Sequence, residues 1–138
     1  MDYTITDTPS NEDAEALFNN LKEFNLAHIE LDVVQELAIF QHDEEGTLVA
    51  GLSAETHGNW LSVSYLWIRE KARGKGLGSK MMQDAETEAV RRGCKFAFLD
   101  TFSFQAKDFY LKLGYQEVFT LEHYPVAGKR HYFTKSLI

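Results

Sequence analysis

Three glycines fall within five residues of the chain, in the segment Arg73-Gly74-Lys75-Gly76-Leu77-Gly78. Glycine lets a backbone turn tightly, and it lets a ligand approach the amides without meeting a Cβ atom. The segment stands between an expected strand and an expected helix, whose first amides lack internal partners and carry partial positive charge. Lys71 and Lys80 flank the same turn. Together these features predict a binding site for an anion such as a diphosphate.

Two familiar phosphate-binding patterns fit this segment incompletely. A P-loop requires Gly-Lys-Ser/Thr four residues after its first glycine, whereas the fifth residue after Gly74 is Ser79, with no Gly-Lys before it. A dinucleotide fingerprint requires Gly-x-Gly-x-x-Gly, which Gly74 and Gly76 begin but Ser79 does not complete. Asp100 lies near the distance at which such sites carry a ribose-binding carboxylate, so a dinucleotide-binding module remains an alternative.

Periodicity indicates which elements position the loop. Leu77, Met81, Ala85 and Ala89 recur every fourth residue, as on one face of a helix, and Gly93 follows where a helix ends in a left-handed residue. The segment 60–68 instead alternates in the manner of a strand. A strand, a helix and a second strand across residues 60–99 predict one parallel crossover.

The whole pattern predicts an α+β domain, with a mixed, mainly antiparallel central sheet flanked by helices. The expected order is β-α-β-β-β-α-β-α-β-β. The corresponding segments are a strand at 3–6, a helix at 11–25, strands at 37–41, 47–55 and 60–68, a helix at 76–92, a strand at 96–99, a helix at 106–113, and strands at 115–123 and 131–137.

Length and composition limit the class of protein. A chain of 138 residues with 44% hydrophobic and 13% aromatic content predicts one globular domain, residues 1–138. No apolar run is long enough for a membrane span, and the acidic N-terminus does not resemble a signal peptide. Cys94 is the single cysteine, which excludes an internal disulfide and fits a cytoplasmic protein. The histidines show no metal-ligand spacing, so no metal is expected.

Charge is distributed unevenly along the chain. Residues 1–70 hold 14 acidic and 2 basic side chains, a balance of −12, while residues 71–138 hold 7 acidic and 12 basic ones, a balance of +5. The distribution fits a protein with one cationic and one anionic ligand, and it equally fits two solvated faces of one domain. Neither a nucleic acid nor a membrane is expected as a partner.

The loop also follows the pattern Arg-x-x-Gly-x-Gly, through Arg73, Gly76 and Gly78. With Tyr65-Leu66-Trp67-Ile68 before it and the segment 103–115 after it, the chain resembles the GNAT superfamily of acetyl-CoA-dependent N-acetyltransferases. The resemblance implies transfer of an acetyl group from acetyl-CoA to a primary amine, by direct attack in a ternary complex. It also implies a homodimer. A CoA-binding protein without catalytic activity is the remaining alternative.

The resemblance assigns roles to particular residues. The backbone of Leu66, Trp67 and Ile68 would lie along the pantetheine arm of acetyl-CoA, and a backbone amide near Leu66 or Ile68 would polarise the thioester carbonyl. Tyr110 would be the general acid that protonates the leaving thiolate. The remaining expected cofactor-binding residues are Arg73, Gly74, Lys75, Gly76, Leu77, Gly78, Ser103 and Ala106, where Ser103 replaces the asparagine of many family members.

The general base and the acceptor stay open. Many family members carry a glutamate on the strand before the loop, but here the strand 60–68 holds no carboxylate. The candidates are Glu55, His57 and Asp100, and a chain of water molecules would serve equally. The acidic half motivates a cationic acceptor, either a small molecule or a lysine side chain. Aromatic residues that would suit such an amine at the rim are Phe102, Phe104, Tyr124 and Tyr132.

Overall fold

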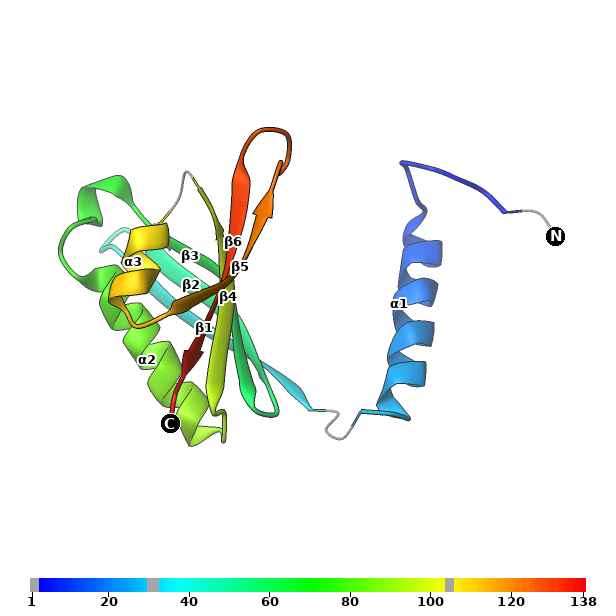
Figure 1. Cartoon of the computed structure of the whole chain (residues 1–138), viewed down its shortest axis with the longest axis horizontal. Coiled ribbons are helices and arrows are strands. Elements are labelled where there is room, and N and C mark those ends of the chain that lie inside the picture. Colours follow the sequence, from blue (N-terminus) through cyan, green and yellow to red (C-terminus); the bar gives the residue numbers. More distant parts are fainter. Residues whose placement is uncertain (1–2, 30–32, 104–105) are drawn as a thin grey trace. The chain divides into compact units, whose positions relative to one another are not determined.

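The computed structural model describes residues 3–29, 33–103 and 106–138 (Figure 1). Its contacts divide the chain into two compact units, residues 1–32 and residues 33–138. The first unit contains α1 (Asn11–Leu26), which begins where the Ser10 hydroxyl accepts a hydrogen bond from the amide of Asp13. That side chain satisfies an amide that the helix itself leaves without a partner, and it confirms the predicted start of the helix.

The structure assigns no strand to residues 3–6, where the sequence predicts one. A short apolar alternation makes a strand only where a neighbouring strand takes up its backbone hydrogen bonds. From α1 onward the predicted order of elements is confirmed.

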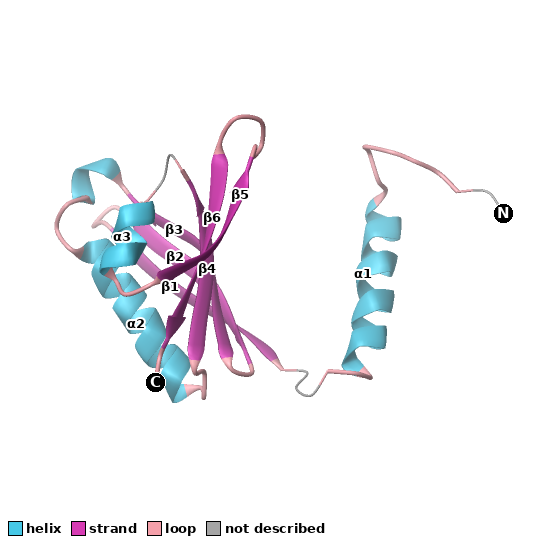
Figure 2. Ribbon diagram, in the orientation of Figure 1, coloured by secondary structure: helices cyan, strands magenta, loops and turns pink. Residues whose placement is uncertain are grey.

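The second unit is built on one six-stranded sheet, with strand order β1-β2-β3-β4-β6-β5 (Figure 2). Its strands are β1 (Val34–His42), β2 (Leu48–His57), β3 (Trp60–Ile68), β4 (Phe96–Phe102), β5 (Gln116–Glu122) and β6 (Lys129–Ser136). Its helices are η1 (Glu70–Ala72), α2 (Leu77–Arg91) and α3 (Lys107–Lys112). Only β3 and β4 pair in parallel among these strands, so the predicted mainly antiparallel sheet with one crossover is confirmed.

The parallel pair β3–β4 comes apart partway along its length. The paired residues run from Trp60–Phe96 to Val63–Leu99, although both strands continue beyond the last pair. On its other side β3 has a bulge, because Ser53 pairs with Tyr65 whereas Ala54 pairs with Val63. A bulge bends its strand and increases the local twist. The bulge therefore stands where β3 turns away from β4.

The two faces of the sheet differ. α2 and α3 cover one face (Figure 1), and the buried residues Ala97, Leu99 and Thr101 of β4 point to it. Side chains alternate along a strand, so Phe98, Asp100 and Phe102 point to the opposite face, where each is half-buried. The core on the helix side includes Met81, Met82, Ala85 and Ala89 of α2, which form its buried stripe.

Candidate active site

The glycine loop connects β3 to α2 and adopts a backbone that requires glycine. Gly74 has φ +76° and Gly76 has φ +82°, both in the left-handed region that other residues rarely adopt. Gly76 is also the N-cap of α2, so the free amides of the first helical turn follow it directly. The predicted strand–loop–helix arrangement is confirmed, and it places the partial positive charge of the helix N-terminus at the loop.

The third glycine of the motif has a different role. Gly78 lies inside α2, and a Cβ atom on it would come within 3.3 Å of Cζ of Phe109 in α3. The absence of a side chain therefore allows the ring of Phe109 to approach the first turn of α2 closely. All three glycines were expected at the cofactor, and the structure adds a packing role for Gly78.

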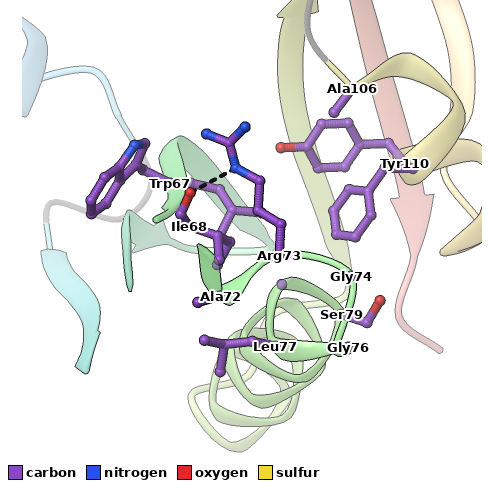
Figure 3. A pocket seen from close by; sticks show the side chains of 13 residues that line it. Trp67, Ile68, Ala72, Arg73, Gly74, Gly76, Leu77, Ser79, Ala106 and Tyr110 are labelled. Atoms are coloured by element: carbon purple, nitrogen blue, oxygen red, sulfur yellow. Dashed lines mark hydrogen bonds between the residues drawn. The ribbon is translucent and has the colours of Figure 1, made fainter. Parts of the chain in front are cut away.

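Arg73 joins the loop to the end of β3. Its Nε atom donates a hydrogen bond of 2.9 Å to the carbonyl oxygen of Ile68, drawn as a dashed line in Figure 3. Arg69, the residue that follows β3, forms an ion pair of 3.2 Å with Asp43. The guanidinium of Arg73 is thus held beside the glycine loop, where an anionic ligand would meet it.

A cavity of about 670 Å³ lies between the end of β3, the glycine loop and α3 (Figure 3). Its lining includes most of the residues expected to bind a cofactor, namely Leu66, Trp67, Ile68, Arg73, Gly74, Gly76, Leu77, Gly78 and Ala106. Lys75 and Ser103 are not in the lining. Sequence analysis did not include Ala72, Ser79 and Phe109, which complete it with Tyr110; each is sequence-adjacent to a residue that it did include.

Tyr110 is buried on α3 and borders the cavity. Its ring packs edge-on against Phe109 and Tyr115, with ring centroids 5.1 and 6.0 Å apart. Figure 3 shows its hydroxyl directed away from α3, toward the side of the cavity where Arg73 lies. Burial raises the pKa of the phenol, and the negative charge of Asp100 raises it further. The hydroxyl therefore keeps its proton at neutral pH.

A polar cluster anchors the start of α3 and so helps to place Tyr110. Lys107, the first residue of α3, forms an ion pair of 3.1 Å with Glu117 of β5. The other carboxylate oxygen of Glu117 contacts Nδ1 of the buried His131 at 2.6 Å and accepts a short hydrogen bond from the Thr120 hydroxyl. The Thr120 and His131 hydrogen bonds and Lys107 lower the pKa of Glu117 to about 2. Sequence analysis missed this cluster, because its members are distant along the chain.

The three side chains considered for the general base occupy two places. Asp100 is the first residue of β4 beyond the last β3–β4 pair, and its Oδ2 accepts a hydrogen bond of 2.7 Å from Nε of Arg130. Glu55 and His57 lie at the other end of β3, opposite Ser62 and Trp60 in the sheet register. Ser62 precedes the first cavity-lining residue of β3 by four positions, or roughly 13 Å of strand. None of the three side chains, Asp100 included, lines the cavity.

The described residues contain neither a metal-ligand cluster nor a membrane-spanning helix. In the part of the chain that the structure describes, no three His, Cys, Asp or Glu side chains gather as metal ligands would. Over the same residues, no helix combines the length and apolar character needed to cross a membrane. The segment 103–106 of the family-like pattern is described only at its ends, because Phe104 and Gln105 lie outside the described residues.

Comparison with known proteins assigns the chain to a family. The model of the Acetyltransferase (GNAT) family matches residues 4–115, which is most of the chain. The protein therefore belongs to the GNAT acetyltransferase family, and it is an acyltransferase. Blasticidin-S acetyltransferase of Streptomyces morookaense is 36% identical over 101 residues, covering 72% of this chain and 74% of that protein.

Solved structures agree with this assignment. A crystal structure of an acetyltransferase from Bacillus cereus has a TM-score of 0.84 and 28% identity, covering 96% of this chain and 97% of that one. An aminoglycoside 6'-N-acetyltransferase, complexed with coenzyme A, has a TM-score of 0.68 and 19% identity, covering 75% and 74%. The second similarity is one of fold alone. The predicted GNAT-type fold is thereby confirmed.

Proposed function

We propose that the protein transfers an acetyl group from acetyl-CoA to a primary amine, by direct attack within a ternary complex. The observation that carries the proposal is the cavity of about 670 Å³ between the glycine loop, β3 and α3, with the buried Tyr110 at its wall. It combines an anion-binding loop, an exposed strand end and a protonated hydroxyl. Those are the parts that an acetyl-CoA thioester and its leaving group require.

Different residues of the cavity bind different parts of acetyl-CoA. The loop at Gly74 and Gly76, with Arg73 beside it, offers backbone amides and a guanidinium to the diphosphate. The end of β3 at Leu66–Ile68 is free of β4, so its backbone groups are available to the amides of the pantetheine arm. A solved GNAT neighbour complexed with coenzyme A supports this cosubstrate. Lys75 and Ser103 complete the proposed set from outside the cavity wall.

The chemistry follows from these positions. The amine nitrogen attacks the thioester carbonyl carbon, and a backbone amide near Leu66 or Ile68 stabilises the negative charge that develops on the oxygen. The C–S bond then breaks, and the departing thiolate takes the proton of the Tyr110 hydroxyl. The proton lost by the amine passes to a general base. Glu55, His57, Asp100 and a chain of water molecules remain the candidates for that base.

The acceptor is proposed to be a cationic amine, carried by a small molecule or by a lysine side chain. Two observations support this class. Residues 1–70 have a charge balance of −12, which attracts cations. The relative that is 36% identical is named for its acetylation of blasticidin S, which favours a small molecule over a lysine side chain.

The organisation of the protein is part of the same proposal. The chain acts as one domain, residues 1–138, and the family match supports this because it includes residues of both compact units. We expect a cytoplasmic homodimer that needs no metal and binds neither nucleic acid nor membrane. Light scattering at the assay concentration tests the dimer, and a monomeric mass would contradict it.

Two measurements test the function. Coenzyme A should raise the melting temperature of the protein whereas NAD should not, because a ligand that binds only the folded state stabilises it. The reverse result would favour a dinucleotide-binding module. Release of free thiol from acetyl-CoA should then depend on an added amine. Coenzyme A binding without thiol release across a panel of polyamines, aminoglycosides and lysine peptides would indicate a binding protein without this activity.

A further inference from the structure

One cluster of side chains lies on the face of the sheet opposite α2 and α3, where β3 and β4 diverge. Asp100 directly follows Leu99, the last residue of β4 that pairs with β3. In β6, Tyr132 is the register partner of Asp100 and Arg130 is the partner of Phe102. Directly opposed residues of neighbouring strands point to the same face. The four side chains therefore share this face at the point of divergence.

The guanidinium of Arg130 is fixed on several sides. Its Nε donates to Oδ2 of Asp100 at 2.7 Å, and its Nη1 donates to the Tyr124 hydroxyl at 3.4 Å. Its Cζ atom lies 5.7 Å from the ring centroid of Phe102 and 5.4 Å from those of Tyr124 and Tyr132. Cations at such distances over ring faces are attracted by the ring quadrupole.

The aromatic rings support one another as well. Phe102 and Tyr124 are stacked, with centroids 5.6 Å apart and planes at 16°. The ring centroid of Tyr132 lies 6.3 Å from that of Phe98 and 5.9 Å from that of Phe119. Groups held in this way lose little conformational freedom when a ligand binds. The cluster is therefore a rigid surface before any ligand arrives.

The cluster is partly exposed and lies close to the proposed chemistry. The side chains of Arg130 and Asp100 are 30% and 25% exposed, so a ligand reaches both. Asp100 directly follows the last β3–β4 pair, so it lies where the two strands diverge, and its negative charge also contributes to the raised pKa of Tyr110. A molecule bound to this face would therefore lie next to the gap between β3 and β4 through which the proposed acetyl donor would extend.

We infer that Asp100, Arg130 and the rings of Phe102, Tyr124 and Tyr132 form an acceptor subsite for a cationic amine that carries a planar, unsaturated group. The carboxylate of Asp100 accepts a hydrogen bond from the ammonium or its neighbouring donors. The planar group stacks on the guanidinium and the ring faces, which a saturated group of equal size does less well. The inference rests on the proposed function, because it supplies that reaction with its second substrate.

The test compares two amines of equal carbon number, 2-phenylethylamine and 2-cyclohexylethylamine, by calorimetric titration of the protein saturated with coenzyme A. The aromatic amine should bind roughly threefold to tenfold more tightly, although the saturated amine is the more hydrophobic. Arg130→Met should reduce this ratio below about twofold. Asp100→Asn should weaken the binding of both amines by a similar factor, because both carry an ammonium group.

Two further variants keep the test decisive. Tyr124→Leu removes one ring and keeps the ion pair between Asp100 and Arg130. It should also reduce the affinity ratio, and it replaces Arg130→Met in the test if that variant does not fold. Trp60→Leu is the matched control and should leave the ratio unchanged, because Trp60 packs against Phe96 at the far end of the β3–β4 pair, with the two rings tilted by 34°. Retained stabilisation by coenzyme A shows that each variant is folded.

Each outcome separates this inference from the proposed function. Equal affinity of the unaltered protein for the two amines, or an unchanged ratio in both Arg130→Met and Tyr124→Leu, would overturn the subsite. Acetylation of amines without a ring preference would leave the enzyme activity intact and reject the subsite. A ring preference in binding without any acetyl transfer would support the subsite and reject the activity.

Discussion

Gly78 in α2 faces Phe109 in α3 so closely that a Cβ atom on the glycine would lie 3.3 Å from Cζ of the ring. The contact joins the helix that follows the glycine loop to the helix that carries Tyr110. Both residues also line the cavity. The spacing between the loop and α3 therefore depends on the absence of a side chain at one position.

Gly78→Ala should affect the cavity more than it affects stability. The added methyl group pushes the ring end of Phe109, while alanine in a helix gains up to about 1 kcal/mol over glycine. We expect the free energy of unfolding to change by less than about 1 kcal/mol and the dissociation constant of coenzyme A to rise several-fold. Urea unfolding and calorimetric titration measure the two quantities. Unchanged coenzyme A affinity would show that the ring position does not matter for binding.

Gly76→Ala should weaken acetyl-CoA binding strongly while the fold remains intact. The left-handed backbone costs a residue with a Cβ about 1–2 kcal/mol, and the methyl group stands where phosphate oxygens would meet the amides. Gly46→Ala is the matched control. Gly46 has φ +83° against +82° for Gly76, neither Cβ would meet an atom within 4 Å, and Gly46 lies in the β1–β2 turn.

Both alanine variants should lose a similar amount of stability in urea unfolding, but only Gly76→Ala should lose affinity for coenzyme A. If the two variants bound coenzyme A with equal affinity, the diphosphate would bind elsewhere than at the glycine loop.

Tyr110→Phe tests the general acid. The change removes one hydroxyl and keeps the ring that packs against Phe109, Tyr115 and Phe133. The single-turnover rate of acetyl transfer should fall roughly a hundred- to ten-thousand-fold, while coenzyme A affinity stays near that of the unaltered protein. A rate within about threefold of the original would exclude the acid role, and a purely structural role would instead appear as lost stability in Tyr110→Ala.

The Glu117 cluster should make stability depend on pH in the acid range. The pKa of the Glu117 carboxyl is lowered from the ordinary 4.5 to about 2 in the folded protein. As the pH falls, the unfolded chain therefore takes up a proton at Glu117 before the folded protein does. The stability that Glu117 contributes is thus present above about pH 4.5 and is lost progressively toward pH 2. Urea unfolding across this range should show a smaller loss for Glu117→Gln.

Glu122→Gln is the control for that measurement. Glu122 lies on the same strand, but its side chain is 64% exposed and its ion pair with Lys129 is longer, at 3.6 Å. Exposed pairs of this kind contribute little, so the pH profile should follow that of the unaltered protein. Identical profiles for Glu117→Gln and the unaltered protein would contradict the assigned role of the cluster.

The amino-acid sequence by itself determined the features that depend on neighbouring residues. The predicted strand 60–68 matches β3, Trp60–Ile68, and the predicted helix 76–92 contains α2, Leu77–Arg91. Side-chain periodicity and glycine backbone freedom act over a few residues, so they can be recognised in the sequence without knowledge of the fold. The same local information located the glycine loop, whereas Tyr110 was identified through the family resemblance.

Only the tertiary structure decided the features that depend on distant partners. Asp100 and Arg130 are 30 residues apart, and nothing in either local segment indicates their ion pair. Residues 3–6 show the converse, because their local pattern favours a strand but the structure assigns none to them. Pairing and cavity formation depend on which surfaces the folded chain brings into contact, and local patterns constrain that only weakly.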